Sequence, residues 1–306
     1  MLHTAVMSHE VLAYLLHSQT RLVLDATLGS GGHTKAILEA SDRVSVIGID
    51  RDEQAIDLAA QQLGGYRDRV AFYHGVYTEL EAALHSRGQV DGVLVDHGLS
   101  SIQLDDAHRG FSYRLDGPLD MRMSGRGQTA GELIARAGVA ELKGILEDFG
   151  EITRAGRIAR AIKKAADRGN LKTTGDLRKV LEEMFGRTPS PVFLSRLFQS
   201  LRIAINRELD LLDEFLGKIL RFVNPDARLV MISYHSLEDR LIKEFFKRSA
   251  AVCICPPEVP ECVCGHKPVL EVLTKKVVRT SREEIKLNPR SRSARLRAAR
   301  VIGQAG

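Results

Sequence analysis

The sequence predicts an α/β fold with a mostly parallel, Rossmann-like sheet that is interrupted by an all-helical insertion. Three features lead to this prediction: apolar runs alternate with helical patterns over the first hundred residues, strand signals vanish over 111–201, and the alternation resumes after 202. Such alternation is typical of βαβ units, whose helices cover both faces of a parallel sheet. We therefore expect one domain formed by 1–110 and 202–306, with a second domain, 111–201, inserted into it.

Four strands are predicted before the insertion, because each is a short apolar run bounded by polar or glycine-rich residues. They are Leu22–Asp25, Val44–Asp50, Val70–His74 and Val90–Asp96. Three helices are predicted between these strands: one that starts near Thr34, one that begins at Asp52 and one around Leu80–Leu84.

The inserted segment shows helical periodicity and turns without a convincing strand. Its predicted helices are Ala130–Ala137, Ala140–Phe149, Thr153–Asp167, Asp176–Phe185 and one from Pro191 onward. After the insertion we expect a long helix, a strand and a further helix, at Asn206–Phe222, Arg228–Ser233 and Leu237–Arg248.

The composition is that of a globular protein with a sizeable core. Of the 306 residues, 44% are hydrophobic and 27% are charged, which excludes disordered, collagen-like and disulfide-rich classes. No uncharged apolar run approaches the ~18 residues that a membrane helix needs. The first residues lack the basic region of a signal peptide. We expect a cytoplasmic protein without a membrane partner, and the oligomeric state is left open.

The net charge of +5 is concentrated near the C-terminus. Between Lys275 and Arg300 there are ten Lys or Arg and two acidic residues, which gives +8 and leaves −3 for the rest of the chain. This asymmetry predicts a basic tail that binds a polyanion. A solvated tail that binds nothing specific is the alternative.

A glycine-rich turn joins the first predicted strand to its helix, with the sequence Asp-Ala-Thr-Leu-Gly-Ser-Gly-Gly-His from Asp25 to His33. Glycines allow a sharp turn and a close approach of a ligand to the backbone. A crevice at the carboxyl ends of parallel strands is the usual ligand site. The dinucleotide fingerprint would require glycine where Thr34 stands, so a nicotinamide cofactor is poorly supported. A tight turn without a ligand is the alternative.

Three of the predicted strands end in aspartate, namely Asp25, Asp50 and Asp96. Asp50 can accept both hydroxyls of a ribose. Asp25 can orient the glycine-rich turn or a cationic group of a ligand. Three carboxylates would repel a pyrophosphate, but they suit a ligand with an ammonium and a sulfonium. The charges therefore favour S-adenosylmethionine.

Several segments carry a resemblance to a known family. They are Asp25–His33, Asp96–Asp105, Arg109–Ser112, Gly117–Met123, Arg157–Ile162, Phe198–Ile203, Ile232–Arg240 and Asn288–Ser293. In this order they resemble the bacterial ribosomal RNA small subunit methyltransferase H family. The resemblance implies a class I S-adenosylmethionine-dependent methyltransferase domain with a helical insert. It also implies methylation of the exocyclic N4 of one cytidine in the decoding centre of 16S rRNA.

The resemblance further implies cofactor-binding residues. Gly31, Gly32 and His33 would contact S-adenosylmethionine through the turn, Asp50 would hold the ribose, Tyr77 would pack by the adenine, and Asp96 and Gln103 would complete the site. From the residues alone, Tyr77 could equally belong to the core and Gln103 to a solvated loop. The chain departs from the family at His97, usually leucine, and at Ile102, where proline is frequent. Neither departure removes a cofactor residue.

The proton acceptor of the reaction is left open between two candidates. Asp96 ends its strand beside the turn formed by Ser100 and Ser101, and His235 follows the strand that ends at Ser233. Either could orient the amine and accept its proton. His235 could instead cap or pack against the following helix, whose N-cap could be Ser236 with Asp239 three residues on.

The target base must leave its stack to reach such a site. One predicted helix carries a basic stripe at helical spacing: Arg154, Arg157, Arg160, Lys164 and Arg168. The basic tail adds Arg290, Arg292, Arg295 and Arg297. These two surfaces could bind phosphates of 16S rRNA within the small ribosomal subunit, with 111–201 as the RNA-recognition domain. A solvated face, a methyltransferase acting on DNA or another RNA, and a non-catalytic RNA-binding assembly factor are the alternatives.

All four cysteines lie in one segment: Cys253, Cys255, Cys262 and Cys264, with His266 two residues beyond. Such a cluster suggests metal before disulfides in a reducing compartment. However, the two Cys-x-Cys pairs are tighter than the usual zinc-binding spacing. Structural zinc, a hairpin without metal and a redox pair all stay open, and no metal ligand is assigned.

Overall fold

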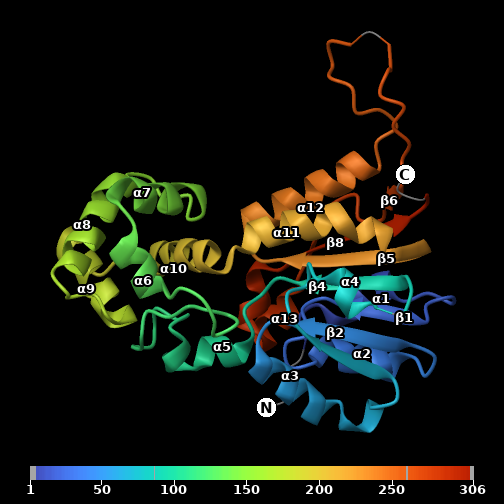
Figure 1. Ribbon diagram of the computed structural model, residues 1–306, viewed down its shortest axis with the longest axis horizontal. Coiled ribbons are helices and arrows are strands. Elements are labelled where there is room, and N and C mark those ends of the chain that lie inside the picture. The colour runs from blue at the N-terminus through green and yellow to red at the C-terminus, as the bar shows by residue number, and fades with distance from the viewer. Residues whose placement is uncertain (1–4, 86, 260, 304–306) are drawn as a thin grey trace. The chain divides into compact units, whose positions relative to one another are not determined.

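The computed structural model describes residues 5–85, 87–259 and 261–303, and it divides the chain into two compact units (Figure 1). The first unit is Met1–Gly98 with Asp210–Gly306, and the second is Leu99–Leu209. The predicted insertion, 111–201, falls inside the second unit. Among the described residues, none of the helices combines the length and the apolar composition that crossing a membrane requires.

The first unit is built on one sheet with the strand order β3-β2-β1-β4-β5-β8-β6, and β7 pairs with β8. The strands are β1 (Leu22–Asp25), β2 (Ser45–Asp50), β3 (Val70–His74), β4 (Val90–Asp96), β5 (Val223–Ser233), β6 (Leu270–Val272), β7 (Val278–Arg279) and β8 (Arg295–Val301). The pairings among β1 to β5 are parallel, and β8 is antiparallel to β5. The predicted fold class, with a mostly parallel sheet, is confirmed.

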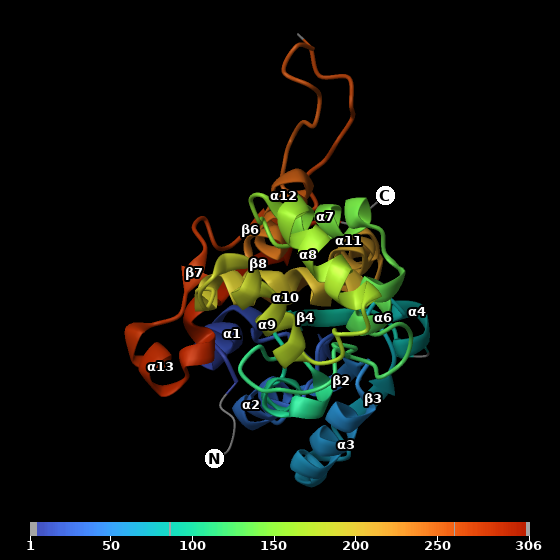
Figure 2. The same cartoon turned by 90° about the vertical axis from the view of Figure 1, so that its left-hand side faces the viewer.

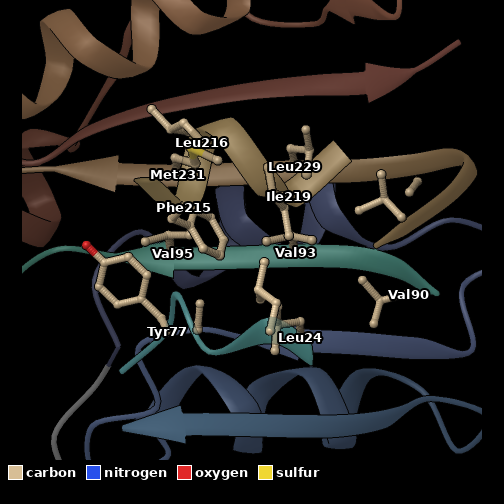
Figure 3. Close-up of a cluster of buried hydrophobic side chains, with 14 of the residues drawn as sticks. Leu24, Tyr77, Val90, Val93, Val95, Phe215, Leu216, Ile219, Leu229 and Met231 are labelled. Carbon is tan, nitrogen blue, oxygen red and sulfur yellow. The ribbon is translucent and has the colours of Figure 1, made fainter. Parts of the chain in front are cut away.

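Helices cover both faces of this sheet, because alternate side chains of each strand point to opposite faces. Leu24, Val93 and Val95 belong to one apolar cluster (Figure 3), and Val23 and Leu94 belong to the other. The first cluster includes side chains of α4 (Leu80–Ala83), α11 (Glu208–Lys218) and α12 (Ser236–Ser249). The second includes side chains of α1 (Ser8–Leu15), α2 (Gly32–Ala40) and α3 (Glu53–Gln62). The remaining helix of this unit is α13 (Arg282–Leu287).

The second unit packs helices around its own apolar core. Its helices are α5 (Ser101–Asp105), α6 (Ala130–Arg136), α7 (Val139–Asp148), α8 (Ala155–Asp167), α9 (Thr174–Phe185) and α10 (Pro191–Asn206). Local signals fix their first turns: Thr129 and Thr173 each form a capping box, and Ser190 caps α10 before a proline at its first position.

One predicted element is wrong, and another differs at its ends. The helix expected over Asn206–Phe222 is present as α11, but it begins at Glu208, because Arg207 has a left-handed φ of 52° that ends α10, and it gives way after Lys218 to a 3-10 turn, Ile219–Arg221. The expected basic tail is wrong, because its last part is not a free tail. Arg295–Val301 is the strand β8, paired with β5 and β6, because Leu296 and Ala298 are buried by the sheet.

Candidate active site

The glycine-rich turn after β1 is held in place by close packing. Gly31 is the N-cap of α2 with a φ of 86°, a left-handed conformation that favours glycine. A Cβ atom at Gly48 of β2 would lie 2.7 Å from Leu28 Cδ1, so the strand and the turn approach more closely than a side chain allows. These two glycines keep the turn against the sheet.

Asp25 serves the turn itself. Its side chain is 1% exposed, and it accepts hydrogen bonds from Thr34 Oγ1 at 2.7 Å and from the backbone nitrogen of Thr27 at 3.3 Å. Burial raises the pKa of this carboxyl above its usual range. Of its two predicted roles, the contacts support the orientation of the turn.

Asp50 ends β2 and connects the turn to α3. One carboxylate oxygen accepts a hydrogen bond from the backbone nitrogen of Gly29 at 2.8 Å, and the other accepts one from that of Asp52 at 2.9 Å. Burial raises the pKa of Asp50 to about 6. Each oxygen has a second lone pair, so the carboxylate can still accept the two hydroxyls of a ribose.

Asp96 and His33 face each other across the same end of the sheet. Asp96 Oδ2 lies 3.4 Å from His33 Nε2, and the Asp96 backbone nitrogen donates to Thr27 Oγ1 at 2.6 Å. Burial alone would lower the pKa of His33, but the interaction with Asp96 outweighs it and the pKa is raised. Among the described residues, Asp96 Oδ1 and His33 Nδ1 are buried without a hydrogen-bond partner. Unpaired buried polar atoms are costly, so a ligand with polar groups fits here.

Tyr234, for which the sequence predicts no role, lies close to Asp96. Burial and then the charge of Asp96 raise the pKa of Tyr234 well above its usual range. A Cβ atom at Gly98 would lie 2.8 Å from Tyr234 Cε2, so the ring packs on the backbone that follows β4. The position of Tyr234 near Asp96 follows from the strand register, because β4 and β5 pair Asp96 with Ile232 and Tyr234 lies two residues after Ile232.

Tyr77 lies at the border of the apolar core. It is 9% exposed, and its ring makes edge contacts with Phe215 at 5.2 Å and with His97 at 6.1 Å between centroids. Figure 3 shows the ring at one end of the cluster, with its hydroxyl directed away from the labelled aliphatic side chains. The core interpretation of Tyr77 is therefore confirmed, and its contact with adenine stays a prediction.

Gln103 belongs to the second unit, unlike the other predicted cofactor residues. Its side chain is 7% exposed, which makes the solvated-loop interpretation wrong. Ser100 and Gln103 form a capping box at the start of α5, with both hydrogen bonds at 3.2 Å. The neighbouring Ile102 is 36% exposed.

His235 is the N-cap of α12. Its Nδ1 accepts from the Glu238 backbone nitrogen at 3.4 Å, and its Nε2 lies 3.1 Å from Glu238 Oε1. The alternative cap, Ser236 with Asp239, is wrong because α12 begins one residue earlier and Asp239 binds Arg297 Nε at 2.7 Å instead. These contacts give His235 a structural role and leave Asp96 as the better candidate for the proton acceptor.

The predicted basic stripe lies on the exposed side of α8 and at its two ends. Ile158 and Ile162 are buried in the core of the second unit, and the stripe consists of exposed side chains: Arg154, Arg157, Arg160, Lys164 and Arg168. The four arginines of the predicted basic tail fall into two groups. Arg290 and Arg292 are exposed, but Arg295 and Arg297 both face Asp239, at 3.8 and 2.7 Å.

Comparison with known proteins gives full-length similarity. The MraW methylase family matches residues 1–302 of the chain. A protein of Sorangium cellulosum is 46% identical over 99% of this chain and 92% of its own length. Proteins of Geotalea uraniireducens and Syntrophotalea carbinolica are 44% and 42% identical, each over 98% of both chains. All three are named ribosomal RNA small subunit methyltransferase H.

Proposed function

The chain belongs to the MraW methylase family, and we propose on that basis that it methylates the exocyclic N4 of one cytidine in the decoding centre of 16S rRNA, with S-adenosylmethionine as methyl donor. The observation that carries the proposal is the 42–46% identity, over nearly the whole chain, to relatives named for methylation of small-subunit ribosomal RNA. The carboxylates at the strand ends support it.

The first unit would hold the cofactor. S-adenosylmethionine, when bound, supplies a methyl group on a positively charged sulfur. The ionised Asp50 carboxylate would accept the ribose hydroxyls, and the backbone at Gly31 and Gly32 allows the close approach that a ligand in the turn requires. The unpaired oxygen of Asp96 and the unpaired nitrogen of His33 offer further polar contacts. The acidic character of this end of the sheet favours a cationic donor over a phosphate-bearing one.

Asp96 would act on the target base. The exocyclic amine is a weak nucleophile because its lone pair is delocalised into the ring, so it must be oriented and relieved of a proton. Asp96 Oδ1 is an acceptor without a partner among the described residues. The Thr27 contact fixes the backbone of Asp96, and His33 holds its other oxygen at 3.4 Å. Tyr234 packs beside this carboxylate and restricts where a base can enter.

The second unit would contribute RNA binding through the exposed basic side chains of α8. Lysine and arginine side chains that neutralise phosphates displace counterions, which makes binding strong at low salt. Arg290 and Arg292 in the first unit are exposed and could add to it. We do not assign Arg295 and Arg297 to RNA, because they are engaged with Asp239.

Mass analysis of 16S rRNA from cells that lack this protein tests the proposal. The decoding-centre cytidine should lose one methyl group, and the intact gene should restore it, whereas Asp96→Ala should not. Purified protein should methylate small subunits or 16S rRNA but not DNA. An unchanged 16S rRNA mass would contradict the proposal. Failure to bind S-adenosylhomocysteine in a titration would instead favour a non-catalytic assembly factor.

A further inference from the structure

The segment between α12 and β6 is a long loop that leaves the sheet. Figures 1 and 2 show its described residues, 250–259 and 261–269, in orange, extending away from the rest of the first unit in both views. A hydrogen bond of 2.8 Å from the Val269 backbone nitrogen to the Ser249 carbonyl oxygen closes its base. Loops of this length without their own helices or strands are uncommon in compact domains. Val252 and Val263 are 76% and 80% exposed, so apolar packing does not order the loop.

The four cysteine sulfurs of this loop converge on one point. The Sγ atoms of Cys253, Cys255, Cys262 and Cys264 all lie within 4.8 Å of one another. Cys262 Sγ is 3.6 Å from Cys264 Sγ, which is 3.8 Å from Cys253 Sγ. Four thiolates around a tetrahedral zinc ion, with Zn–S distances near 2.3 Å, have sulfur–sulfur separations of about 3.8 Å. The distances of 3.6 and 3.8 Å match this value, and all four thiols are free.

Backbone groups support the same arrangement. The nitrogen of Ile254 donates to Cys264 Sγ at 3.5 Å, and that of Cys255 donates to Cys253 Sγ at 3.4 Å. Hydrogen bonds of this kind orient metal-bound ligands. Lys247, Arg248 and one acidic residue, Glu244, line the same surface depression as Cys253. The net charge of these three side chains is positive, and it lies near a site whose four thiolates would exceed the charge of a divalent ion.

His266 does not join the cluster. Its Nε2 lies 3.0 Å from the Arg248 carbonyl oxygen, a backbone contact at the base of the loop. We propose that Cys253, Cys255, Cys262 and Cys264 form a four-sulfur structural zinc site that orders this loop, with His266 outside the metal's ligands. A closed set of four protein ligands leaves no position for a substrate, so the site is structural rather than catalytic.

Elemental analysis of the full-length chain, purified without a metal-binding tag or added zinc, tests the proposal. We expect one zinc ion per chain in the unmodified protein. Cys253→Ser and Cys264→Ser should each lose the zinc, and His266→Ala should retain it. X-ray absorption at the zinc edge should show a first shell of sulfur alone, at about 2.3 Å. Variants should bind S-adenosylhomocysteine normally, which shows that they fold.

Three results would overturn the proposal. The first is a chain without metal whose four thiols react freely with a thiol reagent, and the second is a mass that reveals disulfide bonds. The third is stoichiometric iron with the visible absorption of an iron–thiolate or iron–sulfur centre. Loss of zinc in His266→Ala would overturn the assignment of four sulfur ligands. None of these results depends on methyl transfer, so they leave the proposed function unaffected.

Discussion

At the level of single residues, the strand-end carboxylates of the candidate site differ in how far their hydrogen bonds are satisfied. Asp25 is fully engaged by the turn, whereas Asp96 keeps one buried oxygen without a partner among the described residues. The two aspartates end neighbouring strands, yet their contacts suit them for different tasks. Asp25 orients the backbone, and Asp96 is available to a ligand or substrate.

Replacement of Asp96 by alanine is expected to lower the methyl-transfer rate by about 10²–10⁴-fold, the usual contribution of a positioned proton acceptor. Single-turnover methylation of 16S rRNA measures this loss, and circular dichroism reports the fold. Asp57→Asn, at an exposed position of α3, is the matched control and should leave the rate unchanged. Near-normal turnover of Asp96→Ala would remove this residue from the mechanism.

The affinity for S-adenosylhomocysteine should depend on the ionisation of Asp50, whose pKa is raised to about 6 by burial. The ribose hydroxyls donate to the ionised form, so binding should be constant at higher pH and weaken as the pH falls through about 6. One titrating group allows a change of up to about tenfold per pH unit. Calorimetry across this range measures it. Asp50→Asn should bind weakly and without this pH dependence, and an unaltered profile would exclude the ribose role.

Thr34→Val should destabilise the first unit by about 1–3 kcal/mol, because it removes a hydrogen bond from a buried carboxylate. Urea denaturation measures the free energy of unfolding. Thr34→Ser keeps the hydroxyl that donates to Asp25 at 2.7 Å and is the matched control. A loss in Thr34→Val that does not exceed the loss in Thr34→Ser would contradict the assignment of this stabilisation to the hydrogen bond.

The sequence predicts Asp25, Asp50 and Asp96 as strand-end residues, because in each case an apolar run of strand length is followed directly by the aspartate. It could not separate Tyr234 from His235. In the structure His235 caps α12, whereas Tyr234 packs against Gly98 beside Asp96. This difference depends on tertiary packing, which the local sequence does not reveal.

At the level of elements, the sequence predicts β1, β3 and β4 with the bounds that the structure has, because each is an apolar run with clear flanks. The strand β8 was missed because arginine interrupts its apolar pattern. Its partners are distant in the sequence, so no local signal reveals them: β8 pairs with β5 and β6, and its Arg297 binds Asp239 of α12. The sequence also predicts separate helices from Pro191 and from Asn206, but not the exact position of the break between them, because Arg207 is not the glycine that usually marks a left-handed residue.

The exposed face of α8 should control the salt dependence of RNA binding. In the double variant Arg157→Gln and Arg160→Gln, the slope of log affinity against log salt should become shallower by about one for each phosphate that is no longer neutralised. Filter binding of 16S rRNA at several salt concentrations measures it. The control replaces two exposed arginines of the first unit, Arg67 and Arg87, by glutamine. Equal slopes in both double variants would assign the effect to net charge alone.

For the whole molecule, Asp50 lies in the first unit and the basic stripe of α8 lies in the second, so the defects of variants at these two places should separate. Asp50→Asn should raise KM for S-adenosylmethionine and leave RNA affinity unchanged. The Arg157→Gln and Arg160→Gln variant should raise KM for the RNA substrate and leave cofactor affinity unchanged. Steady-state kinetics with each substrate varied in turn measures both. A coupled loss in either variant would show that one unit senses occupancy of the other.

The order of the strands also has a consequence for synthesis on the ribosome. The chain is made from its N-terminus, but β5, β8 and β6 are encoded after the second unit, and β8 lies between β5 and β6. The strand β4 therefore has no partner on its β5 side while more than a hundred further residues are synthesised. The second unit, being continuous, can fold meanwhile. An apolar edge that stays open during translation is a natural binding site for a chaperone.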